Sequence, residues 1–474
     1  MENITKTLVD FGIQTQFADL PEKVVHETKR IFLDIIGCAI GGLGMDKGRI
    51  AIEVAKSLGG TPEATILGTA IKVAGANAAF ANGELMHSLD YCPVLSPAHV
   101  APYVTAAPLA LAEVKKASGK TMITALAIAH EMSSRIGISQ GNMRAKEGGY
   151  PVRSYGFGCN TFGATAGAAR ILGLSPEQFR DAFGTAGYFA PLPAHTKWVY
   201  TPRNGMAKYG PSGWTAHAGV VVALLAEKGY EGDRTILDGE YGFWAMNGSE
   251  TFDGQKITEN LGKDWVVLNT TYKYWPCCGL FGSSLDAFSK VIRENSIKPD
   301  EIEKILIKGE GYAAQPRFQT TDVRSHVDAQ MSLPYNVAMV AYGIKIGPEW
   351  QLRSNIENPQ IQSLMNKVSY QPNPKCEEAR HQDLVVEGRP YISRRPAYAE
   401  VFARGTSFLQ EMEYANWLSM GVEEYRASDE GLADKFRANV AGVLEGDSPK
   451  AAIDMILHLE ELDDMTELIG LLSK

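Results

Sequence analysis

Several motifs of cofactor-dependent and hydrolytic enzymes are missing from this sequence of 474 residues. It contains no GxGxxG after an expected strand, no P-loop, no HExxH and no GxSxG. Those motifs mark dinucleotide, nucleotide-triphosphate, zinc-protease and serine-hydrolase sites. The six cysteines include no CxxC pair, so their spacing fits neither a zinc site nor an iron–sulfur cluster. Nothing in these patterns therefore calls for a bound nucleotide, zinc, flavin or serine nucleophile.

An excess of basic residues is also missing, because the formal net charge is −9 at pH 7. A nucleic-acid partner needs a basic face, so the charge balance argues against one. The opening residues, MENITKTLVDFGIQ, have no basic stretch followed by an apolar core. They therefore predict a cytoplasmic protein without a signal peptide. In a reducing cytoplasm the cysteines, including the adjacent Cys277 and Cys278, are expected to be free thiols.

Charge of either sign is absent from residues 91–112, a run long enough to raise the question of a membrane span. Four prolines interrupt this run, and a helix interior does not tolerate so many. The run therefore predicts a buried loop that leads into a buried helix at about residues 101–116, with no span of a membrane.

The first part of the chain, residues 1–265, reads as almost entirely helical, with apolar residues at helical spacing and recognisable start and stop residues. Pro21 and Pro176 suit first helical turns, and Ser175 is a good N-cap. Glycine and alanine recur through these segments, which favours close approach of helix backbones in a compact bundle. The clearest expected helices cover residues 22–42, 121–137, 159–174 and 213–232, with another starting at residue 176.

The pattern changes near residue 265, where short alternating segments and helical segments mix. This mixture predicts an α+β domain over residues 266–404. The tail from Ser407 reads as helical and is expected to return to the first domain, so that residues 1–265 and 405–474 form one mostly helical unit. Strands are expected at residues 303–309, 367–371 and 397–403, and helices at residues 279–295 and 328–343.

An acid and an imidazole, Asp90 and His99, stand at the edge of and inside the uncharged run. Burying ionisable groups costs free energy unless they are paired, so such groups often mark a site. In a functional interpretation His99 is a general acid or base, and Asp90 orients it or a substrate group. In the alternative, His99 is a satisfied buried histidine and Asp90 caps a loop.

Three basic residues are candidate binders of a carboxylate. Lys208 stands in RNGMAKYGPSGW just before an expected helix, and Lys273 stands between aromatics in TYKYWPCCG. Each ammonium either projects into a cleft to hold an anion or belongs to a lysine lying along the surface. Arg203 is a similar candidate.

Tyr335, in QMSLPYNVAM, lies on an apolar helix face. It is either a core tyrosine with one hydrogen bond or a catalytic phenol. His195 lies in a loop bounded by prolines, where it could belong to a lid. His130 and His217 lie on helices of small or apolar residues, which favours core or interhelical hydrogen-bonding roles.

Taken together, blocks along nearly the whole chain resemble the MmgE/PrpD family, whose known members include 2-methylcitrate dehydratase, cis-aconitate decarboxylase and iminodisuccinate epimerase. No single block is diagnostic, and their order and spacing carry the resemblance. The blocks are DLPEKVVHETKRIFLDIIGCAIGG, NGELMHSLDY, PAHVAPYVTAAPLALAE, FGATAGAARILGLSPEQ, AKYGPSGWTAHAGVVVALLAEKGYEG, KYWPCCG and QMSLPYNVA.

The resemblance implies a helical domain and a smaller α+β lid domain, with the active site between them. It also implies a homodimer and no metal or organic cofactor. Residue by residue, it implies catalytic roles for five residues, of which the two lysines also bind substrate: Asp90, His99, Lys208, Lys273 and Tyr335.

The chain departs from the family pattern where histidines are usual. Ser154, beside Arg153, stands where the decarboxylase-like pattern has a histidine before the FGATAGAA helix. Pro211 and Cys278 replace further histidines after the two lysines. Most of these replacements do not transfer protons near neutral pH, although a Cys278 with a depressed pKa is able to. The resemblance places Arg153, Ser154 and Cys278 among the expected substrate-binding residues, and Arg203 joins them on its local sequence alone.

The acid-rich Asp-Phe-Asp-Asp segment of the family is also reduced here, to Asp90-Tyr91-Cys92-Pro93. Five aromatic residues surround the expected site and either meet a less polar end of the ligand or pack the domain interface. These are Tyr155, Phe157, Trp198, Tyr274 and Trp275.

The chemistry shared by the family removes a proton next to a carboxylate, which needs a placed base and stabilisation of the developing charge. We expect His99 to transfer the proton, the two lysines to hold a di- or tricarboxylate, and Tyr335 to be a second donor. The sequence accordingly favours a cofactor-independent lyase, first of all a dehydratase, acting on a small polycarboxylate-like substrate. An epimerase of a dicarboxylate, or a decarboxylase, is the alternative.

Overall fold

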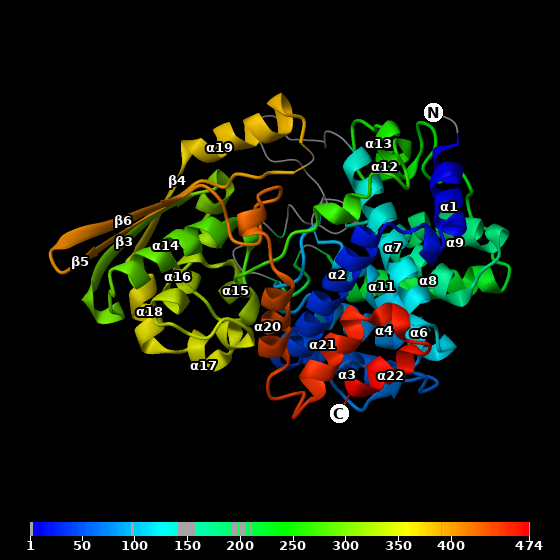
Figure 1. Cartoon of the computed structure of the whole chain (residues 1–474), viewed down its shortest axis with the longest axis horizontal. Coiled ribbons are helices and arrows are strands. Elements are labelled where there is room, and N and C mark those ends of the chain that lie inside the picture. The colour runs from blue at the N-terminus through cyan, green and yellow to red at the C-terminus, as the bar shows by residue number, and fades with distance from the viewer. Residues whose placement is uncertain are drawn as a thin grey trace.

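The computed structural model describes residues 3–95, 99–140, 157–191, 198, 205–208, 210–389 and 391–473. It has two lobes (Figure 1), a larger one of helices and a smaller one with a sheet. This arrangement confirms the predicted mostly helical fold with a smaller α+β part.

The larger lobe, here called the helical domain, is built from elements that run from the N-terminus to residue 258. Helices α7 and α8, and α4 and α11, pack side by side at its centre. The helices are α1 (Ile4–Gln14), α2 (Glu22–Gly41), α3 (Asp46–Leu58), α4 (Gly75–Met86), α5 (Ala101–Val104), α6 (Ala106–Lys115), α7 (Gly119–Ser139), α8 (Asn160–Leu172), α9 (Pro176–Phe189), α11 (Ser212–Glu227), α12 (Phe243–Met246) and α13 (Gln255–Thr258), with a short hairpin of β1 (Ala64–Thr65) and β2 (Lys72–Val73).

The helix expected at residues 101–116 is present but divided into α5 and α6 at Thr105. Pro108 has no N–H to donate to the Val104 carbonyl, so the helix is interrupted one turn before this proline. Both pieces are buried, as the absence of charge predicts. Among the described residues, no helix combines the length and the apolar character needed to cross a membrane. The six cysteines are free and buried.

Small residues let the central helices touch backbone to backbone. A Cβ atom added at Gly213 of α11 would lie 2.4 Å from the Phe80 carbonyl oxygen of α4, and one at Gly83 would lie 3.1 Å from the Gly213 Cα. A Cβ at Gly163 of α8 would lie 2.3 Å from the Ala129 carbonyl oxygen of α7. The recurrence of glycine in the sequence therefore has the expected packing reason.

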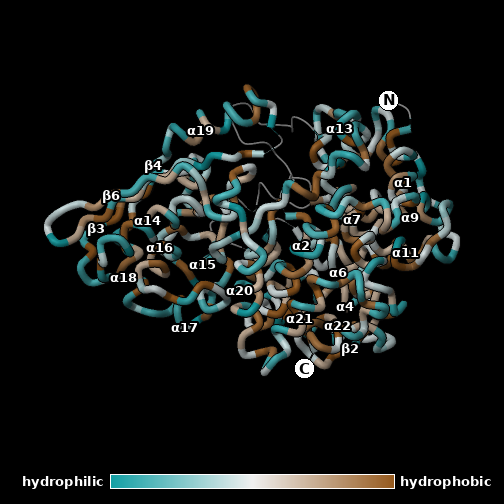
Figure 2. Tube along the Cα trace, viewed as in Figure 1, coloured by the Kyte–Doolittle hydropathy of each residue, from teal (hydrophilic) through white to brown (hydrophobic). Residues whose placement is uncertain are grey.

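The smaller lobe, here called the lid domain, holds a four-stranded sheet in the order β4-β3-β5-β6. Strands β3 and β4 are parallel and the other pairs antiparallel. Helix α14 packs against β3, β5 and β6, and α19 is strongly hydrophilic (Figure 2). The elements are β3 (Ile302–Gly309), β4 (Val368–Pro372), β5 (Ala397–Ala403), β6 (Thr406–Met412), α14 (Gly282–Glu294), α15 (His326–Met331), α16 (Leu333–Ala341), α17 (Arg353–Ile356), α18 (Pro359–Met365) and α19 (Pro374–His381).

The helix expected at residues 328–343 is broken at Ser332, which caps α16 by accepting a hydrogen bond from the Tyr335 N–H. Pro334 stands in the first turn of α16, where its missing N–H has no intrahelical partner to lose. The three predicted strands are present, each within a residue of its expected bounds.

The prediction that the tail is helical from Ser407 is wrong for its first residues, because β6 continues the lid sheet to Met412. One face of β6 is exposed and the other is partly buried, but a leucine, Leu409, lies on the exposed face and a glutamine, Gln410, on the partly buried one. The alternation of apolar and polar residues that reveals a strand is therefore weak there. Three helices follow and α20 packs on α2 of the helical domain. They are α20 (Asp429–Val440), α21 (Ser448–Leu457) and α22 (Met465–Leu471).

We predict that Gly213→Ala destabilises the protein, because its methyl group has no room against the Phe80 carbonyl. Overpacking of this kind costs about 1–3 kcal/mol, and a chemical denaturation curve measures it. Gly470→Ala in α22 is the matched control, because nothing lies within 4 Å of its Cβ position. That variant should be equal to or slightly more stable than wild type, and an equal loss in both variants would contradict the close packing of α4 and α11.

Candidate active site

The turn that follows α4 brings a buried carboxylate into the interface between the two domains. Asp90 is 0% exposed and has a backbone φ of +52°, a left-handed conformation that is uncommon for residues other than glycine. Its carboxylate oxygens lie 3.0 Å from the Lys273 ammonium and 3.8 Å from the Lys208 ammonium. Three residues that the sequence singled out therefore meet in one cluster.

Lys208 is delivered by the segment that precedes α11. It is 2% exposed, also has a positive φ, of +48°, and donates a hydrogen bond to the His87 carbonyl at 2.9 Å. The start of α11 is fixed to α4 by the Glu84 carboxylate, which accepts from the Gly213 N–H at 2.6 Å. An acidic group at this position suits the positive end of the helix dipole. The close contact of α4 and α11 thus sets Lys208 opposite Asp90.

Lys273 comes from the segment that connects the two domains. It is 1% exposed, and its ammonium also donates to the Asp90 carbonyl at 2.7 Å. The preceding residue is tied by its N–H to the Trp417 carbonyl, and Tyr91 donates its hydroxyl to the Tyr274 carbonyl at 2.9 Å. Backbone and side-chain bonds on both sides of Lys273 therefore hold it against Asp90.

Burial and ion pairing have opposite effects on the pKa values of the three charged residues in this cluster. Burial by itself would raise the pKa of Asp90, but the ammonium groups of Lys273 and Lys208 outweigh it and lower the pKa. Burial would likewise lower the pKa of Lys273, which Asp90 instead raises. For Lys208 burial prevails over the attraction of Asp90, and its pKa falls to about 7. Lys273, the lysine nearer to Asp90, is thus charged at neutral pH, whereas Lys208 titrates near neutral pH.

Two histidines adjoin the carboxylate. The His87 Nε2 lies 3.9 Å from an Asp90 oxygen, and the His87 and His99 rings are 5.4 Å apart between centroids. The charge of His99 is also one of the influences that lower the pKa of Asp90. His99 is half-buried, and its Nδ1 lies 3.2 Å from the Cys92 thiol. The structure therefore places His99 beside His87 and Cys92 and close enough to Asp90 to influence its pKa.

The sequence reasoning missed His87. Burial, with Lys208 next in importance, lowers its pKa well below the ordinary value, so its ring is neutral at pH 7 and its protonated form is disfavoured. Its position in MHSLD, three residues before Asp90 and at the end of α4, was the available signal. At a helix end, residues three apart lie near one another.

One nitrogen from each of these histidines and the Cys92 sulfur lie within 4.8 Å of one another, all buried or half-buried. Two imidazoles and a thiol are donors that suit zinc or another soft divalent cation. Two ammonium groups in the same cluster oppose a cation, and burial raises the pKa of Cys92 to about 12, so the thiol keeps its proton. The arrangement favours an anionic ligand over a metal ion.

Tyr335 lies in the core of the lid domain, fully buried, and donates its hydroxyl to the Trp350 carbonyl at 2.7 Å. This is the geometry of the packing alternative, and its catalytic role stays a prediction. Cys278 is buried, and burial raises its pKa to about 11, which removes it as a proton carrier near neutral pH. Arg153, Ser154, Arg203, His195 and Tyr155 fall outside the described residues.

The described aromatic candidates pack mainly on other side chains. The Tyr274 ring meets Trp275 and Trp417 edge-on, and Phe157 packs on Tyr103. The Trp275 indole donates to Asp286 at 2.9 Å. Trp198 lies under the Arg317 guanidinium. Two further histidines have the expected structural bonds, since the Nδ1 atoms of His130 and His217 contact the Leu126 and Ala76 carbonyls.

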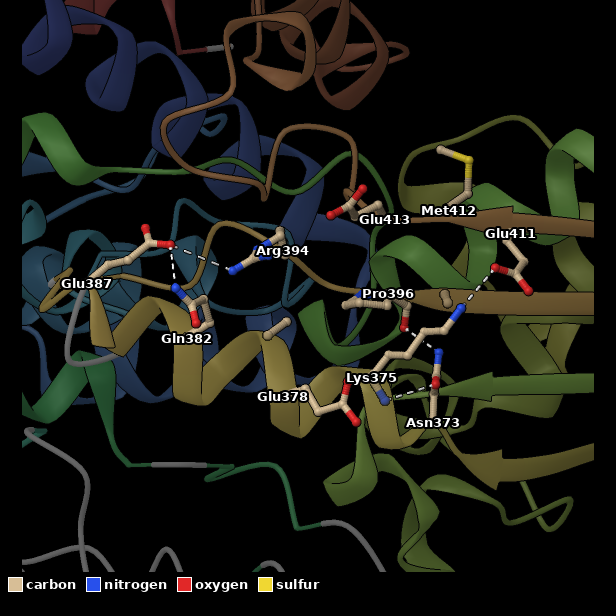
Figure 3. Close-up of a pocket in the computed structure, with 12 residues that line it drawn as sticks. Asn373, Lys375, Glu378, Gln382, Glu387, Arg394, Pro396, Glu411, Met412 and Glu413 are labelled. Carbon is tan, nitrogen blue, oxygen red and sulfur yellow. Dashed lines mark hydrogen bonds and ion pairs between the residues drawn. The ribbon is translucent and has the colours of Figure 1, made fainter. Parts of the chain in front are cut away.

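A separate hollow of about 640 Å³ lies in the lid domain between α19 and the ends of β5 and β6 (Figure 3). Its charged side chains are largely engaged with one another: Lys375 lies 3.3 Å from Glu411, and Arg394 lies 3.9 Å from Glu387. None of the residues that line it belongs to the Asp90 cluster. The interface cluster, with its unequal charge, is the stronger candidate for chemistry.

Comparison with known proteins identifies the class to which this two-domain architecture belongs. Residues 6–255 match the MmgE/PrpD N-terminal domain and residues 275–461 match the MmgE/PrpD C-terminal domain. The chain therefore belongs to the MmgE/PrpD family, which confirms the resemblance seen in its sequence blocks.

Curated relatives match over almost their whole lengths. A cis-aconitate decarboxylase of Aspergillus terreus (strain NIH 2624 / FGSC A1156) is 26% identical over 481 residues, covering 96% of this chain and 93% of that protein. The cis-aconitate decarboxylase of Homo sapiens is 26% identical over 496 residues, covering 100% and 95%. The cis-aconitate decarboxylase-like protein oryM of Aspergillus oryzae is 23% identical over 505 residues, covering 99% and 97%.

We predict that Asp90→Asn lowers the free energy of unfolding by about 3–5 kcal/mol, because it removes the charge that compensates two buried ammonium groups. Since the folded protein lowers the pKa of Asp90 from 3.8, the loss is complete above that pH. It shrinks as the pH falls below 3.8, where the wild-type carboxylate itself becomes protonated. Denaturation curves at pH 7 and at successively lower pH measure it.

The control is Glu357→Gln, which breaks an exposed ion pair with Arg353 one helical turn away. Such surface pairs contribute little, so this variant should match wild type. A small, pH-independent loss in Asp90→Asn would contradict the assigned charge balance.

Proposed function

We propose that this protein is a cofactor-independent lyase that acts on a small polycarboxylate. The observation that carries the proposal is the buried cluster of two ammonium groups and one carboxylate, with two imidazoles beside it. When both lysines are charged, one net positive charge is left for an anionic substrate in a place shielded from water, where electrostatic attraction is strong. The names of the full-length relatives, all of them cis-aconitate decarboxylases or like them, support a tricarboxylate as the substrate.

Substrate binding falls to Lys208 and Lys273. Each ammonium has three N–H donors. Among the described residues, the Lys208 ammonium donates to one carbonyl, and the Lys273 ammonium donates to one carbonyl and to Asp90. Donors therefore remain for a substrate carboxylate. The same charges stabilise the negative charge that develops on a carboxylate when a neighbouring carbon loses a proton or carbon dioxide.

Proton transfer falls to His99, a half-buried residue whose Nδ1 contacts the Cys92 thiol. Asp90 holds the lysines and contributes the negative charge that His99 faces. His87 is adjacent and neutral, and because its pKa is well below the ordinary value it is suited to hydrogen bonding and poorly suited to take up a proton. With Cys278 held as a thiol, the acid–base chemistry among the described residues falls to His99.

Two eliminations use this arrangement. Loss of a β-carboxylate as carbon dioxide, followed by proton delivery to the carbanion, makes a decarboxylase, and the relatives' names favour testing it first. Removal of a proton followed by loss of a β-hydroxyl makes the dehydratase that the sequence favoured. Both reactions need the two lysines to bind the substrate and His99 to transfer a proton. The groups that the substrate carries therefore decide which of the two reactions takes place.

An epimerase is the second candidate, because the family that the sequence resembles includes one. It would remove a proton from a carbon next to a carboxylate with His99 and return a proton to the opposite face from a second group. We also include in the proposal a cytoplasmic homodimer, which the family resemblance implies. Light scattering of the purified protein measures its assembly state.

The deciding assay incubates the purified protein with cis-aconitate, citrate, methylcitrate and amino-dicarboxylates in heavy water, followed by mass spectrometry. Loss of carbon dioxide identifies a decarboxylase, loss of water a dehydratase, and deuterium in recovered substrate without net loss an epimerase. No change in any polycarboxylate, with the protein shown to be folded, would sink the proposal.

We predict that His99→Asn lowers kcat by at least about 100-fold with a much smaller change in KM, because general acid–base groups contribute at this scale. His217→Asn is the control, since that ring is half-buried and contacts the Ala76 carbonyl in the helical domain. Steady-state kinetics on the substrate found above measure both. A His99→Asn enzyme within a few-fold of wild type would remove His99 as the proton-transfer group.

We predict that the affinity for a tricarboxylate falls as the pH rises above 7, because Lys208, with a pKa of about 7, loses its charge there. If only the ammonium form binds, affinity drops about tenfold per pH unit above the pKa. Calorimetric titration from pH 6 to 9 measures this. Lys208→Met should bind weakly at pH 6 and lose the pH dependence, while exposed Lys56→Met should keep both. Binding that strengthens above pH 7 would mean that neutral Lys208 is the active form.

A further inference from the structure

Five consecutive backbone carbonyls, those of residues 87–91, each accept a hydrogen bond from a different buried side chain. We call this run the carbonyl ladder. The donors are Lys208 to His87 (2.9 Å), Gln330 to Ser88 (2.7 Å), Gln351 to Leu89 (2.7 Å), Lys273 to Asp90 (2.7 Å) and Lys435 to Tyr91 (2.7 Å).

The ladder answers a physical need at the end of α4. Residues 87–91 follow the last turn of α4, and their side chains are buried away from water. A buried carbonyl without a partner costs about 1–3 kcal/mol. Here side chains from other parts of the chain supply the missing donors, and Asp90, within this run, has a left-handed backbone conformation.

Three of the donors are cations that come from separate parts of the helical side of the molecule. Lys208 precedes α11, Lys273 lies in the connection, and Lys435 lies on α20, where it also pairs with Asp34 at 2.8 Å. Lys435 additionally donates to the Lys273 carbonyl at 3.1 Å. The ladder carbonyls therefore also compensate the charge of the ammonium groups, since bonds with one charged partner are stronger than neutral ones.

The other two donors, Gln330 and Gln351, are amides of the lid domain. Gln330 lies on α15 and donates both to the Ser88 carbonyl and to the Gln351 side-chain oxygen. Gln351, at the end of the turn at Pro348–Gln351, donates to the Leu89 and Pro276 carbonyls. Gln330 and Gln351 are 0% and 3% exposed. Every N–H of these two amides is therefore used on the ladder, on the Lys273 segment, or between the amides themselves.

We infer that Gln330 and Gln351 are positioning residues through which the lid domain fixes Asp90 against its two lysines. Neither amide has a donor left for substrate, so their effect passes through the backbone of residues 88–90. The inference rests on the proposed function for its catalytic consequence, because Asp90, Lys208 and Lys273 are the charges that the proposed lyase uses. Its structural part, a ladder held from the lid, stands independently of what the substrate is.

The test uses the full-length variants Gln351→Met and Gln330→Met, which keep the side-chain length and remove the donors. The control is Gln319→Met, another lid glutamine, whose amide donates to the Ala313 carbonyl at 2.7 Å outside the ladder. Hydrogen–deuterium exchange of the peptide covering residues 86–95 should rise at least about fivefold in the two ladder variants and stay at the wild-type rate in the control. Thermal unfolding of all three variants shows whether the change is local.

Kinetics on the substrate of the wild-type enzyme test the catalytic consequence. We expect kcat to fall about tenfold or more in each ladder variant while KM changes less than threefold. The pH dependence near 7 should move to lower pH, because an Asp90 displaced from Lys208 attracts its proton less strongly. A loss of global stability alone would not move that pH dependence, and Gln319→Met should leave it in place.

The outcomes separate the two proposals. Unchanged exchange at residues 86–95 in both ladder variants would overturn the inference, whatever the substrate is. Raised exchange with kcat and pH dependence as in wild type would overturn the positioning role. If hydrogen–deuterium exchange at residues 86–95 rises in the ladder variants but the wild-type protein converts no polycarboxylate, the positioning of the ladder by the lid domain is supported and the proposed function is wrong. Should one ladder variant fail to fold, the other decides, since each removes a different carbonyl's donor.

Discussion

The sharing of one buried carboxylate by two ammonium groups is the interaction on which the rest of this molecule depends. Asp90 is 3.0 Å from Lys273 and 3.8 Å from Lys208, with no exposed surface. Charges in such a place are stable only when partners and hydrogen bonds are fixed around them. The close contact of α4 with α11, the connection between the domains, and the amides of the lid domain all meet this requirement. The excess of positive charge in this cluster makes its burial costly in free energy. The same excess suits the cluster to bind an anion.

Much of this organisation was readable from local sequence. The strands at residues 302–309 and 397–403 alternate plainly, and the glycine-rich helices signal the close packing that Gly213 shows. Asp90 and His99 were identifiable because ionisable groups beside a long uncharged run have to be paired. Lys208 and Lys273 gained their importance from the family blocks around them, and the structure shows that they meet the same carboxylate. Their catalytic roles stay predictions.

The features that the sequence did not predict depend on contacts that a local sequence pattern does not show. Gln330, Gln351 and Lys435 act on backbone carbonyls 242, 262 and 344 residues away, and backbone atoms leave no mark in a sequence pattern. His87 lay within a recognised block, but only the turn after α4 shows that its ring faces Asp90. Tyr335 looked like a candidate because of its block, whereas its hydroxyl is used within the lid core. Strand β6 was missed because Leu409 on its exposed face and Gln410 on its partly buried face weaken the hydrophobic alternation.

The origin of the ladder donors has a consequence for how the polypeptide acquires its native state. Asp34, Asp90, Lys208, Lys273 and Lys435 approach one another across four hundred positions of the chain. Contacts of such long range form late and slow folding. A nascent polypeptide that has not yet reached α20 holds Asp34 and the Tyr91 carbonyl without the ammonium that joins them. The charged centre is therefore completed only when the last helices dock, so synthesis cut short before that point yields a chain whose most polar interior is left open.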